Sequence, residues 1–366
     1  MVTFTRYLYF KGDVEIALMG SILKKDKAAA LFWAYELHFS GFGEDAKMIL
    51  WKIYYSLYAS QHVQLENYMK KKEDKLTCDA DQEMFILTFV SNLIIRKYNT
   101  DAFMLAGVTI KTEQDEESLP YSFVEKLERL DYEAVCHDIH DDLSKEDENI
   151  NKKLIAELTS FFKSKGCEKV NCLKKYIVPG VSPLLVLIAR VMTLFTELSQ
   201  RTGSPETSIK KNLYVSCKES EVDQFRTREV EYGKERPSEV FCHLVAQTPY
   251  TDGILSVFNT CADEDVLHIY RKKWLVHAHE NTPVWRTRIE KFGGNRHDDQ
   301  IVWQSDDLEE EFMERYYYDT DEQSSEIQKR NVPQFKNRMS LLEFYAKFGG
   351  SCIYEPCEEI LEALVD

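Results

Sequence analysis

One short stretch of the chain gathers several residue types that bind metal ions, Cys136-His137-Asp138-Ile139-His140-Asp141. On a helix, His137 and His140 would share one face because they are three residues apart. A structural zinc site needs four converging ligands, and its cysteine ligands usually come in pairs separated by two residues. Two further cysteine pairs are separated by four residues instead: Cys167 with Cys172, and Cys352 with Cys357. We therefore predict free cysteines in or near the core, exposed histidines, and no metal or cofactor.

Other catalytic signatures are missing from the sequence. It has no GxxxxGK(S/T) phosphate loop, no GxGxxG after a strand and no GxSxG nucleophile elbow. Pairs of carboxylates are frequent because the chain is acidic, with 62 Asp and Glu against 46 Lys and Arg and a net charge of −16. This excess also argues against a surface built to bind nucleic-acid phosphates. We predict a non-enzymatic protein without catalytic residues; catalytic groups that converge from distant positions are the alternative.

The helix predicted over residues 263–280 is the strongest candidate for partner binding. It opens with Asp263-Glu264-Asp265, an acidic turn that suits the positive end of a helix dipole. Tyr270 and Trp274 share a face at a spacing of four residues, and the basic triplet Arg271-Lys272-Lys273 stands out in an acidic chain. Aromatic anchors supply much of the energy when a helix docks in a groove. The predicted partner-binding residues are Tyr270, Leu275, Val276, Trp274, Arg271 and Lys272.

The run from Tyr270 to Val276 resembles the docking helix of translation-initiation scaffolds, and of their competitors, that bind the cap-binding initiation factor. The resemblance rests on Tyr270, which is followed after four residues by Leu275 and an apolar residue. It implies that Tyr270, Leu275 and Val276 contact a hydrophobic patch of that factor, while a basic residue between them meets an acidic rim. The alternative is an amphipathic helix that is buried within its own domain, with its basic residues facing outward.

A second resemblance concerns the chain as a whole. The string Ala30-Leu31-Phe32-Trp33-Ala34-Tyr35-Glu36-Leu37, the many Tyr and Phe residues, and the segment from Trp285 to Gly294 are similar to proteins of large nucleocytoplasmic DNA viruses of protists. Together the two resemblances imply a non-enzymatic protein–protein adaptor, a viral translation-initiation scaffold in the host cytoplasm or in a viral factory. The alternative function is a structural or assembly protein of a viral particle or replication factory.

The spacing of apolar residues predicts a mainly α-helical protein with minor β structure. Aromatic residues on more than one side of the first helices favour stacked helical hairpins, in the manner of a short α-solenoid. Helices are expected at 13–22, 26–39, 44–58, 81–94, 123–135, 154–162, 237–245 and 254–258, a short strand at 213–217, and acidic loops at 113–118 and 141–149. We predict three regions: an N-terminal helical hairpin domain (1–112), a helical continuation with acidic loops (113–200), and, after the linker 201–206, a C-terminal helical domain with minor β structure (206–366).

Two further features bear on this organisation. The uncharged stretch from Tyr176 to Ala189 is shorter than the roughly 20 residues of a membrane span, and it contains prolines, so we predict a buried helix entered through a proline turn. The sequence Lys291-Phe292-Gly293-Gly294 recurs as Lys347-Phe348-Gly349-Gly350. Each copy is expected to end a helix at a left-handed glycine, either independently or as part of a duplicated unit. In both copies a short extended stretch (300–303; 351–354) and an acidic helix (308–316; 358–364) are predicted to follow.

Overall fold

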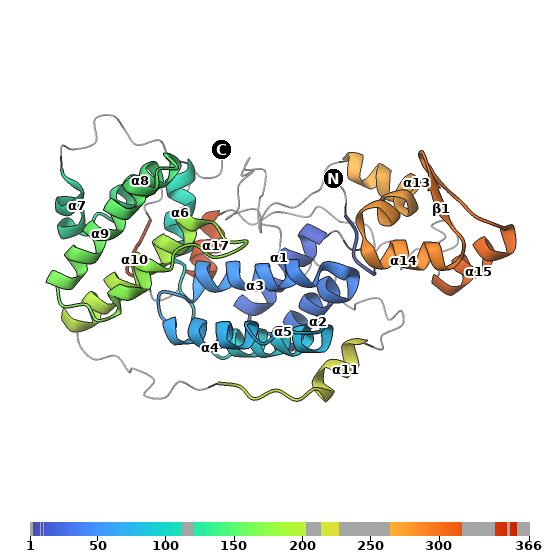
Figure 1. Ribbon diagram of the computed structural model, residues 1–366, viewed down its shortest axis with the longest axis horizontal. Coiled ribbons are helices and arrows are strands. Elements are labelled where there is room, and N and C mark those ends of the chain that lie inside the picture. Colours follow the sequence, from blue (N-terminus) through green and yellow to red (C-terminus); the bar gives the residue numbers. More distant parts are fainter. Residues whose placement is uncertain are drawn as a thin grey trace.

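The computed structural model describes residues 3–7, 9, 11–111, 121–202, 214–226, 264–316, 341–349 and 352–356. Within these ranges the chain is almost entirely helical, with one small two-stranded sheet (Figure 1), which confirms the predicted mainly α-helical class with minor β structure. The predicted helices at 237–245, 254–258 and 358–364 and the acidic loop at 113–118 lie outside the described residues.

The centre of the molecule is a bundle of helices that are buried on several sides. It consists of α1 (Lys11–Leu23), α2 (Lys27–Leu37), η1 (His38–Phe42, one turn of π-helix), α3 (Gly43–Leu57), α4 (Val63–Glu73) and α5 (Asp79–Ile94). The carboxylate of Asp26 caps α2 by accepting a 3.0 Å hydrogen bond from the main-chain nitrogen of Ala29. Every residue from Ala30 to Leu37 is buried, so neighbouring elements cover α2 on all sides.

A second group of helices continues the bundle at one end, on the left in Figure 1. It comprises α6 (Asp101–Lys111), α7 (Phe123–Arg129), α8 (Tyr132–Ser144), α9 (Glu148–Ser164), η2 (Lys169–Lys174, a 3-10 helix) and α10 (Pro183–Thr202). The single helix predicted over 123–135 is in fact two, because Leu130 adopts a left-handed φ of 59° and Asp131 caps α8. The acidic stretch 141–149 is mostly helical, and only residues 145–147 separate α8 from α9.

The long helix α10 lies in the core of this second group. Its residues from Leu184 to Phe195 are all buried. Among the described helices it alone is long and apolar enough to cross a membrane, and 72% of that stretch is buried inside the protein. The helix begins at Pro183, after a turn in which Gly180 has a φ of 72°. This arrangement agrees with the predicted buried helix entered through a proline turn.

Two segments from later in the chain pack back onto these helices. The short helix α11 (Ser220–Arg226) buries Phe225 in the same hydrophobic cluster as α1–α10. The same cluster includes the end of α17 (Leu341–Phe348) and Tyr354. Asp101 at the start of α6 accepts a 3.1 Å hydrogen bond from the main-chain nitrogen of Tyr354, whose hydroxyl donates to Glu133 of α8 at 2.7 Å. We call this assembly, α1–α11 with α17 and residues 352–356, the body.

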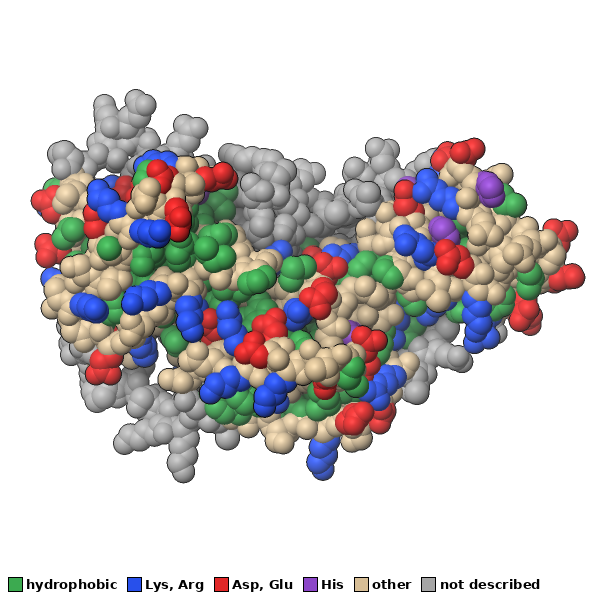
Figure 2. Space-filling model, viewed as in Figure 1, with side chains coloured by type: hydrophobic (Ala, Val, Ile, Leu, Met, Phe, Trp, Pro, Cys, Tyr) green, Lys and Arg blue, Asp and Glu red, His purple; other side chains and the backbone are tan. Residues whose placement is uncertain are grey.

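The remaining elements form a small lobe, on the right in Figure 1. They are α13 (Glu264–Asn281), α14 (Pro283–Lys291), β1 (Asn295–His297), β2 (Gln300–Val302) and α15 (Asp306–Tyr316). The strands β1 and β2 are antiparallel, with Arg296 opposite Ile301. Acidic side chains gather over α15 at the end of the lobe (Figure 2). The buried residues of the lobe's own hydrophobic cluster are Phe4, Trp274, Ala278, Trp285, Ile289, Phe292 and Phe312.

The predicted domain boundary at 201–206 does not coincide with the division between the two hydrophobic clusters. The helices α11 and α17 follow that linker in the sequence but pack in the body, whereas Phe4 from the N-terminal segment completes the cluster of the small lobe. The lobe is therefore an insertion between two segments of the body. Arg201 and Thr202 of the predicted linker belong to the end of α10, and residues 203–206 lie outside the described part of the chain.

The two Lys-Phe-Gly-Gly sequences lie in different parts of the molecule. In the first, α14 ends at Lys291 and Gly293 adopts a φ of 77°, as predicted for a left-handed helix end. The elements β2 and α15 then follow at the expected places. In the second, Phe348 ends α17 and lies in the hydrophobic cluster of the body, while Gly350 lies outside the described residues. Phe292 and Phe348 thus pack in different cores.

Candidate docking groove

The structure places the predicted partner-binding helix inside the small lobe. Trp274 is 6% exposed and lies against Trp285 with 5.5 Å between the ring centroids, and Val276 is also buried. Leu275 is partly buried against the same cluster. Lys273 has φ −135° and ψ 17°, so α13 is kinked within the run from Tyr270 to Leu275 whose spacing defined the prediction. The side chains of the other three predicted residues, Tyr270, Arg271 and Lys272, lie outside the described part of the structure.

These observations correct the expectation that Trp274 and Val276 face a partner. Trp274 packs in the lobe's own core, which is the arrangement expected of an amphipathic helix buried within its domain, and Val276 is buried as well. A partner that contacted Trp274 would first have to open this small cluster.

The residues that the sequence offers as metal ligands do not converge on one site in the described part of the chain. No group of three or more His, Cys, Asp or Glu residues among the described ones could hold a metal ion. Cys136 is buried, and burial raises the pKa of its thiol well above the usual range. Asp138 is paired with Lys126 at 2.8 Å. Burial also raises the pKa of Cys172 to about 11, so both thiols stay protonated and are poor nucleophiles or ligands.

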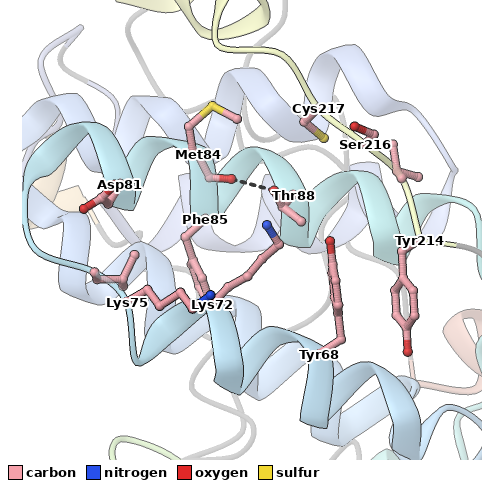
Figure 3. Close-up of a pocket in the computed structure, with 12 residues that line it drawn as sticks. Tyr68, Lys72, Lys75, Asp81, Met84, Phe85, Thr88, Tyr214, Ser216 and Cys217 are labelled. Carbon is pink, nitrogen blue, oxygen red and sulfur yellow. Dashed lines mark hydrogen bonds between the residues drawn. The ribbon is translucent and has the colours of Figure 1, made fainter.

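A groove of about 320 Å³ lies between α4 and α5, the two helices joined by residues 74–78 (Figure 3). Its apolar surface includes two half-buried side chains, Leu76 from this connection and Met84 from α5. One side is closed by a non-helical stretch from Tyr214 to Cys217, which we call the crossing segment. The groove is thus a space between two helices that already has a stretch of polypeptide along one edge.

The crossing segment is held by contacts to both its side chains and its main chain. The ring of Tyr214 stacks on that of Tyr68, with centroids 4.0 Å apart and an angle of 21° between planes, and the Arg96 guanidinium lies 5.4 Å from the Tyr214 centroid. The Tyr214 hydroxyl donates a 3.2 Å hydrogen bond to the carbonyl oxygen of Gln64. One residue on, the main-chain nitrogen of Val215 donates to the side-chain oxygen of Asn92 at 3.2 Å. α4 and α5 therefore bind an extended stretch of chain through an aromatic anchor and a main-chain contact.

Helix α11 anchors the end of the crossing segment to the body. Phe225 stacks on Tyr35 with centroids 4.9 Å apart. The Arg226 side chain pairs with Glu83 of α5, with 2.7 Å between Arg226 Nε and Glu83 Oε2. At the other end of α11, Glu221 pairs with Lys27 of α2 at 2.9 Å. The crossing segment is therefore part of a longer stretch, 214–226, that docks across several helices.

The electrostatics of the groove differ from those of the chain as a whole. Lys72 and Lys75 line it, and Lys72 lies over the ring of Tyr68 with its amine 5.4 Å from the centroid. The one carboxylate in the lining, that of Asp81, accepts hydrogen bonds from the main-chain nitrogen (3.0 Å) and hydroxyl (2.7 Å) of Thr77. These hydrogen bonds lower the pKa of Asp81, since they favour its charged form.

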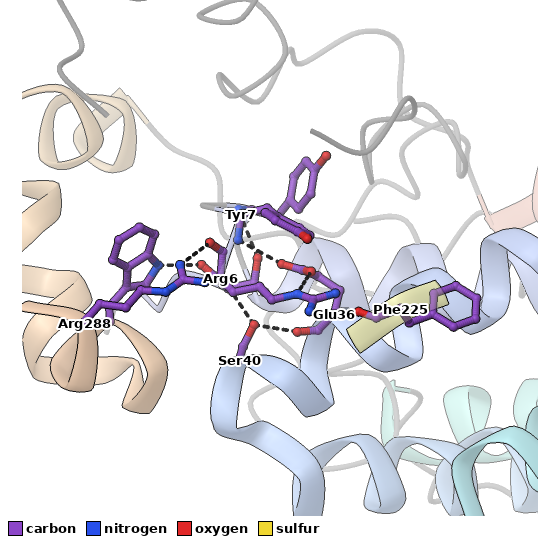
Figure 4. A network of polar contacts seen from close by, with 9 residues as sticks. Arg6, Tyr7, Glu36, Ser40, Phe225 and Arg288 are labelled. Atoms are coloured by element: carbon purple, nitrogen blue, oxygen red, sulfur yellow. Dashed lines mark hydrogen bonds and ion pairs between the residues drawn. The ribbon is translucent and has the colours of Figure 1, made fainter. Parts of the chain in front are cut away.

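A second place where the body holds a stretch of its own chain is the N-terminal segment, residues 3–7, which lies between the small lobe and α2 (Figure 4). Three successive main-chain carbonyls of this segment face one side of α14. Thr282, Trp285 and Arg288 are spaced three residues apart, so they share this face. The hydrogen bonds run from Thr282 Oγ1 to Phe4 O (2.6 Å), from Trp285 Nε1 to Thr5 O (2.9 Å) and from Arg288 Nη1 to Arg6 O (3.1 Å).

On its other side the same segment donates hydrogen bonds to the body. The main-chain nitrogen of Arg6 donates to the Ser40 hydroxyl at 2.7 Å, and that of Tyr7 donates to Glu36 at 3.0 Å. Arg6 Nε donates to the second oxygen of Glu36 at 2.8 Å, and Arg6 Nη1 donates to the carbonyl of Phe225 at 3.2 Å. Glu36 is fully buried, and desolvation raises its pKa while the Arg6 guanidinium opposes that shift. The N-terminal segment therefore ties the lobe, α2 and α11 together.

No protein-family model, curated protein or solved structure matches the chain.

Sequence reasoning missed both the groove and the N-terminal segment. The helix α4 has a signal that could have been found, because Leu65 and Met69 are four residues apart and both are buried, followed by a basic last turn. The stretch 213–217 was expected to be a strand; its described residues, 214–217, have no β partner but run beside α4 and α5. Pairing between distant segments such as Tyr68 and Tyr214 leaves no local pattern.

Proposed function

We propose that the protein is a non-enzymatic protein–protein adaptor and that its body docks an extended segment of a partner in the groove between α4 and α5. The observation that carries the proposal is the crossing segment. The surfaces of α4 and α5 already bind one extended stretch of polypeptide, through the Tyr68–Tyr214 stack and the bond from Val215 to Asn92. About 320 Å³ of open groove continues beside it.

The dimensions and lining of the groove favour a peptide over a small metabolite. The groove lies open along the helices, and its lining combines the half-buried apolar groups of Leu76 and Met84 with polar side chains such as Lys72, Lys75 and Asp81. Enclosed pockets with several converging polar groups are typical of metabolite sites, whereas peptides bind along grooves between helices. Because the partner segment would lie next to Tyr214–Cys217, it would contact the chain's own extended stretch as well as the helices.

A peptide selection on the full-length protein tests this proposal. Random 12-residue peptides are selected by display, and the recovered sequences are synthesised and measured by fluorescence anisotropy. We expect them to bind the natural chain and to lose at least tenfold in affinity for Leu76→Glu with Met84→Glu, which puts charge on the groove floor. Val124→Glu with Ile177→Glu is the matched control, because these side chains are 45% and 72% exposed and the two changes add the same charge outside the groove. Peptides that bind all three proteins equally, or a selection that yields none, would contradict the proposal.

The translation-initiation role and the alternative of a structural or assembly protein of a viral particle rest on the sequence resemblances alone. The burial of Trp274 and Val276 is the reason we assign docking to the groove and not to α13. Pull-down of a cap-binding initiation factor by the natural chain and by Tyr270→Ala with Leu275→Ala tests the first role. Equal recovery with both proteins, or recovery with neither, would count against it, provided that the double variant is folded.

A further inference from the structure

We propose that the partner segment carries an acidic side chain that binds between Lys72 and Lys75, next to an apolar side chain on the groove floor. The inference rests on the proposed function and specifies the chemistry of the partner. In Figure 3 the Lys72 and Lys75 side chains both extend into the space between α4 and α5. Two ammonium groups at one groove are notable in a chain whose net charge is −16.

Three carboxylates are nearest to these lysines in the sequence. Asp74 is exposed just after α4 and does not line the groove, and the other two have partners. On α4, Glu73 pairs with Lys47 at 3.7 Å. On α5, the Asp81 carboxylate is held by Thr77 at the start of the helix. The crossing segment contributes Tyr214, Val215, Ser216 and Cys217 to the lining, none of which is acidic. Two cations and one carboxylate thus line the groove, and its lining carries a net positive charge.

The positions of Lys72 and Lys75 also determine where the acidic side chain of the partner would bind. Lys72 is on the last turn of α4 and Lys75 follows in the loop, whereas Leu76 and Met84 form the neighbouring apolar surface. We therefore expect the partner to place an apolar side chain on Leu76 and Met84 and an acidic side chain near the amines of Lys72 and Lys75. Opposite charges across an interface increase the association rate and select among partners, and they are screened by salt.

The natural chain, full length and unmodified, is measured with peptides from the selection described above. Each peptide is compared with versions in which single acidic residues become Gln or Asn. We expect one acidic position per peptide at which neutralisation weakens binding about fivefold to 20-fold, since each partly exposed charge pair contributes modestly. We also expect the affinity of the acidic peptide, and not of its neutral version, to fall between 50 and 300 mM salt.

A charge reversal locates the contact. In Lys72→Glu with Lys75→Glu, the acidic peptide should bind at least 20-fold more weakly, and a peptide with Lys at the sensitive position should bind better than the acidic one. Lys71→Glu is the matched control, because Lys71 is an exposed residue of the same helix that does not line the groove. Circular dichroism of each variant verifies that it is folded.

The outcomes separate this inference from the proposed function. If peptides bind in the groove but with the same affinity whatever their charge, the acidic contact is wrong and the docking function stands. If Lys71→Glu weakens binding as much as the double variant, the effect comes from the overall charge of α4 and the inference is again overturned. If no selected peptide depends on Leu76 and Met84, both the inference and the docking function fail.

Discussion

The indole Nε1 of Trp285 donates a 2.9 Å hydrogen bond to the carbonyl oxygen of Thr5, 280 residues earlier in the chain. The bonds from Thr282 to Phe4 and from Arg288 to Arg6 flank it. All three acceptors are main-chain carbonyl oxygens, so these hydrogen bonds depend on the backbone conformation of the N-terminal segment and not on its side chains. The lobe is attached to the body by polar contacts to backbone, with Phe4 as the apolar anchor.

Trp285→Phe removes the indole donor and keeps an aromatic ring in the lobe's cluster. The carbonyl of Thr5 would then be buried without that partner, which typically costs about 1–3 kcal/mol. We expect urea unfolding to give a lower free energy and hydrogen exchange in α14 to become faster. Trp303→Phe is the control, since Trp303 is a partly buried tryptophan of the same lobe. Equal effects of the two variants would show that loss of ring volume, and not loss of the hydrogen bond, is responsible.

Arg6→Met is expected to be strongly destabilising because it leaves the fully buried Glu36 carboxylate without its cation. Removing one partner of a buried ion pair typically costs about 3–5 kcal/mol. Adding Glu36→Gln in the Arg6→Met background should recover part of this loss, because the remaining group is then neutral. The free energy of unfolding in urea measures both steps.

An exposed ion pair provides the comparison for Arg6. Lys152 and Glu148 lie 2.8 Å apart with side chains that are 67% and 82% exposed. Lys152→Met should change the free energy of unfolding by less than about 1 kcal/mol. The assignment of Arg6 and Glu36 as a critical buried pair would be wrong if the two single variants were equally stable.

Gly41→Ala should loosen the attachment of the lobe. Gly41 has a φ of 92°, and a Cβ built there would lie 2.6 Å from Cβ of Pro283 at the start of α14. The left-handed conformation alone costs a residue with a Cβ about 1–2 kcal/mol. Gly43→Ala is the comparison for backbone conformation, because Gly43 has a helical φ of −61°. A Cβ there would lie 2.6 Å from Gln82 Oε1 and 2.9 Å from His38 Nδ1, so this variant adds crowding without the left-handed conformation. Limited proteolysis should cleave Gly41→Ala faster than the natural chain or Gly43→Ala.

His62 should contribute to the loss of stability in acid. Burial lowers the pKa of His62 to about 4 from 6.5, so between these values the unfolded chain binds more protons than the folded one. Stability therefore falls as the pH drops from 6.5 toward 4, and the contribution is fully present above 6.5. In His62→Gln, which keeps a donor for the carbonyl of Lys97, this part of the pH dependence of the urea midpoint should flatten. The same change at the exposed His297 should leave the profile unchanged.

The parts of the fold that the sequence predicts are those in which neighbours along the chain determine the outcome. The start of the helix predicted over 26–39 and the buried character of α10 follow from residue type and spacing within one helix, and both are observed. The break at Leu130 was missed because it depends on a left-handed residue with a side chain, where sequence rules expect glycine. Local patterns thus locate helices better than they locate the ends of helices.

The candidate site could not be predicted because its contacts join distant residues. Tyr68 and Tyr214 stack across more than a hundred residues of chain, and nothing near either of them indicates the other. Trp274 illustrates the opposite error. Its spacing from Tyr270 fits a docking helix and a core helix equally well, and the position of Trp285 and Phe312, not the pattern itself, makes it a core residue. Exposure is a property of the whole fold.

Because Phe4 packs in the cluster of the small lobe, this contact can form only after the lobe has been synthesised. The N-terminal segment leaves the ribosome about 280 residues before its partners Thr282, Trp285 and Arg288. At typical translation rates this is a delay on the order of tens of seconds. In that time α1–α10 can assemble and Arg6 can pair with Glu36, whereas the cluster that covers Phe4 has not yet been made. The lobe therefore docks onto a segment whose contacts with α2 can already have formed, and Phe4 lacks its native cluster until then.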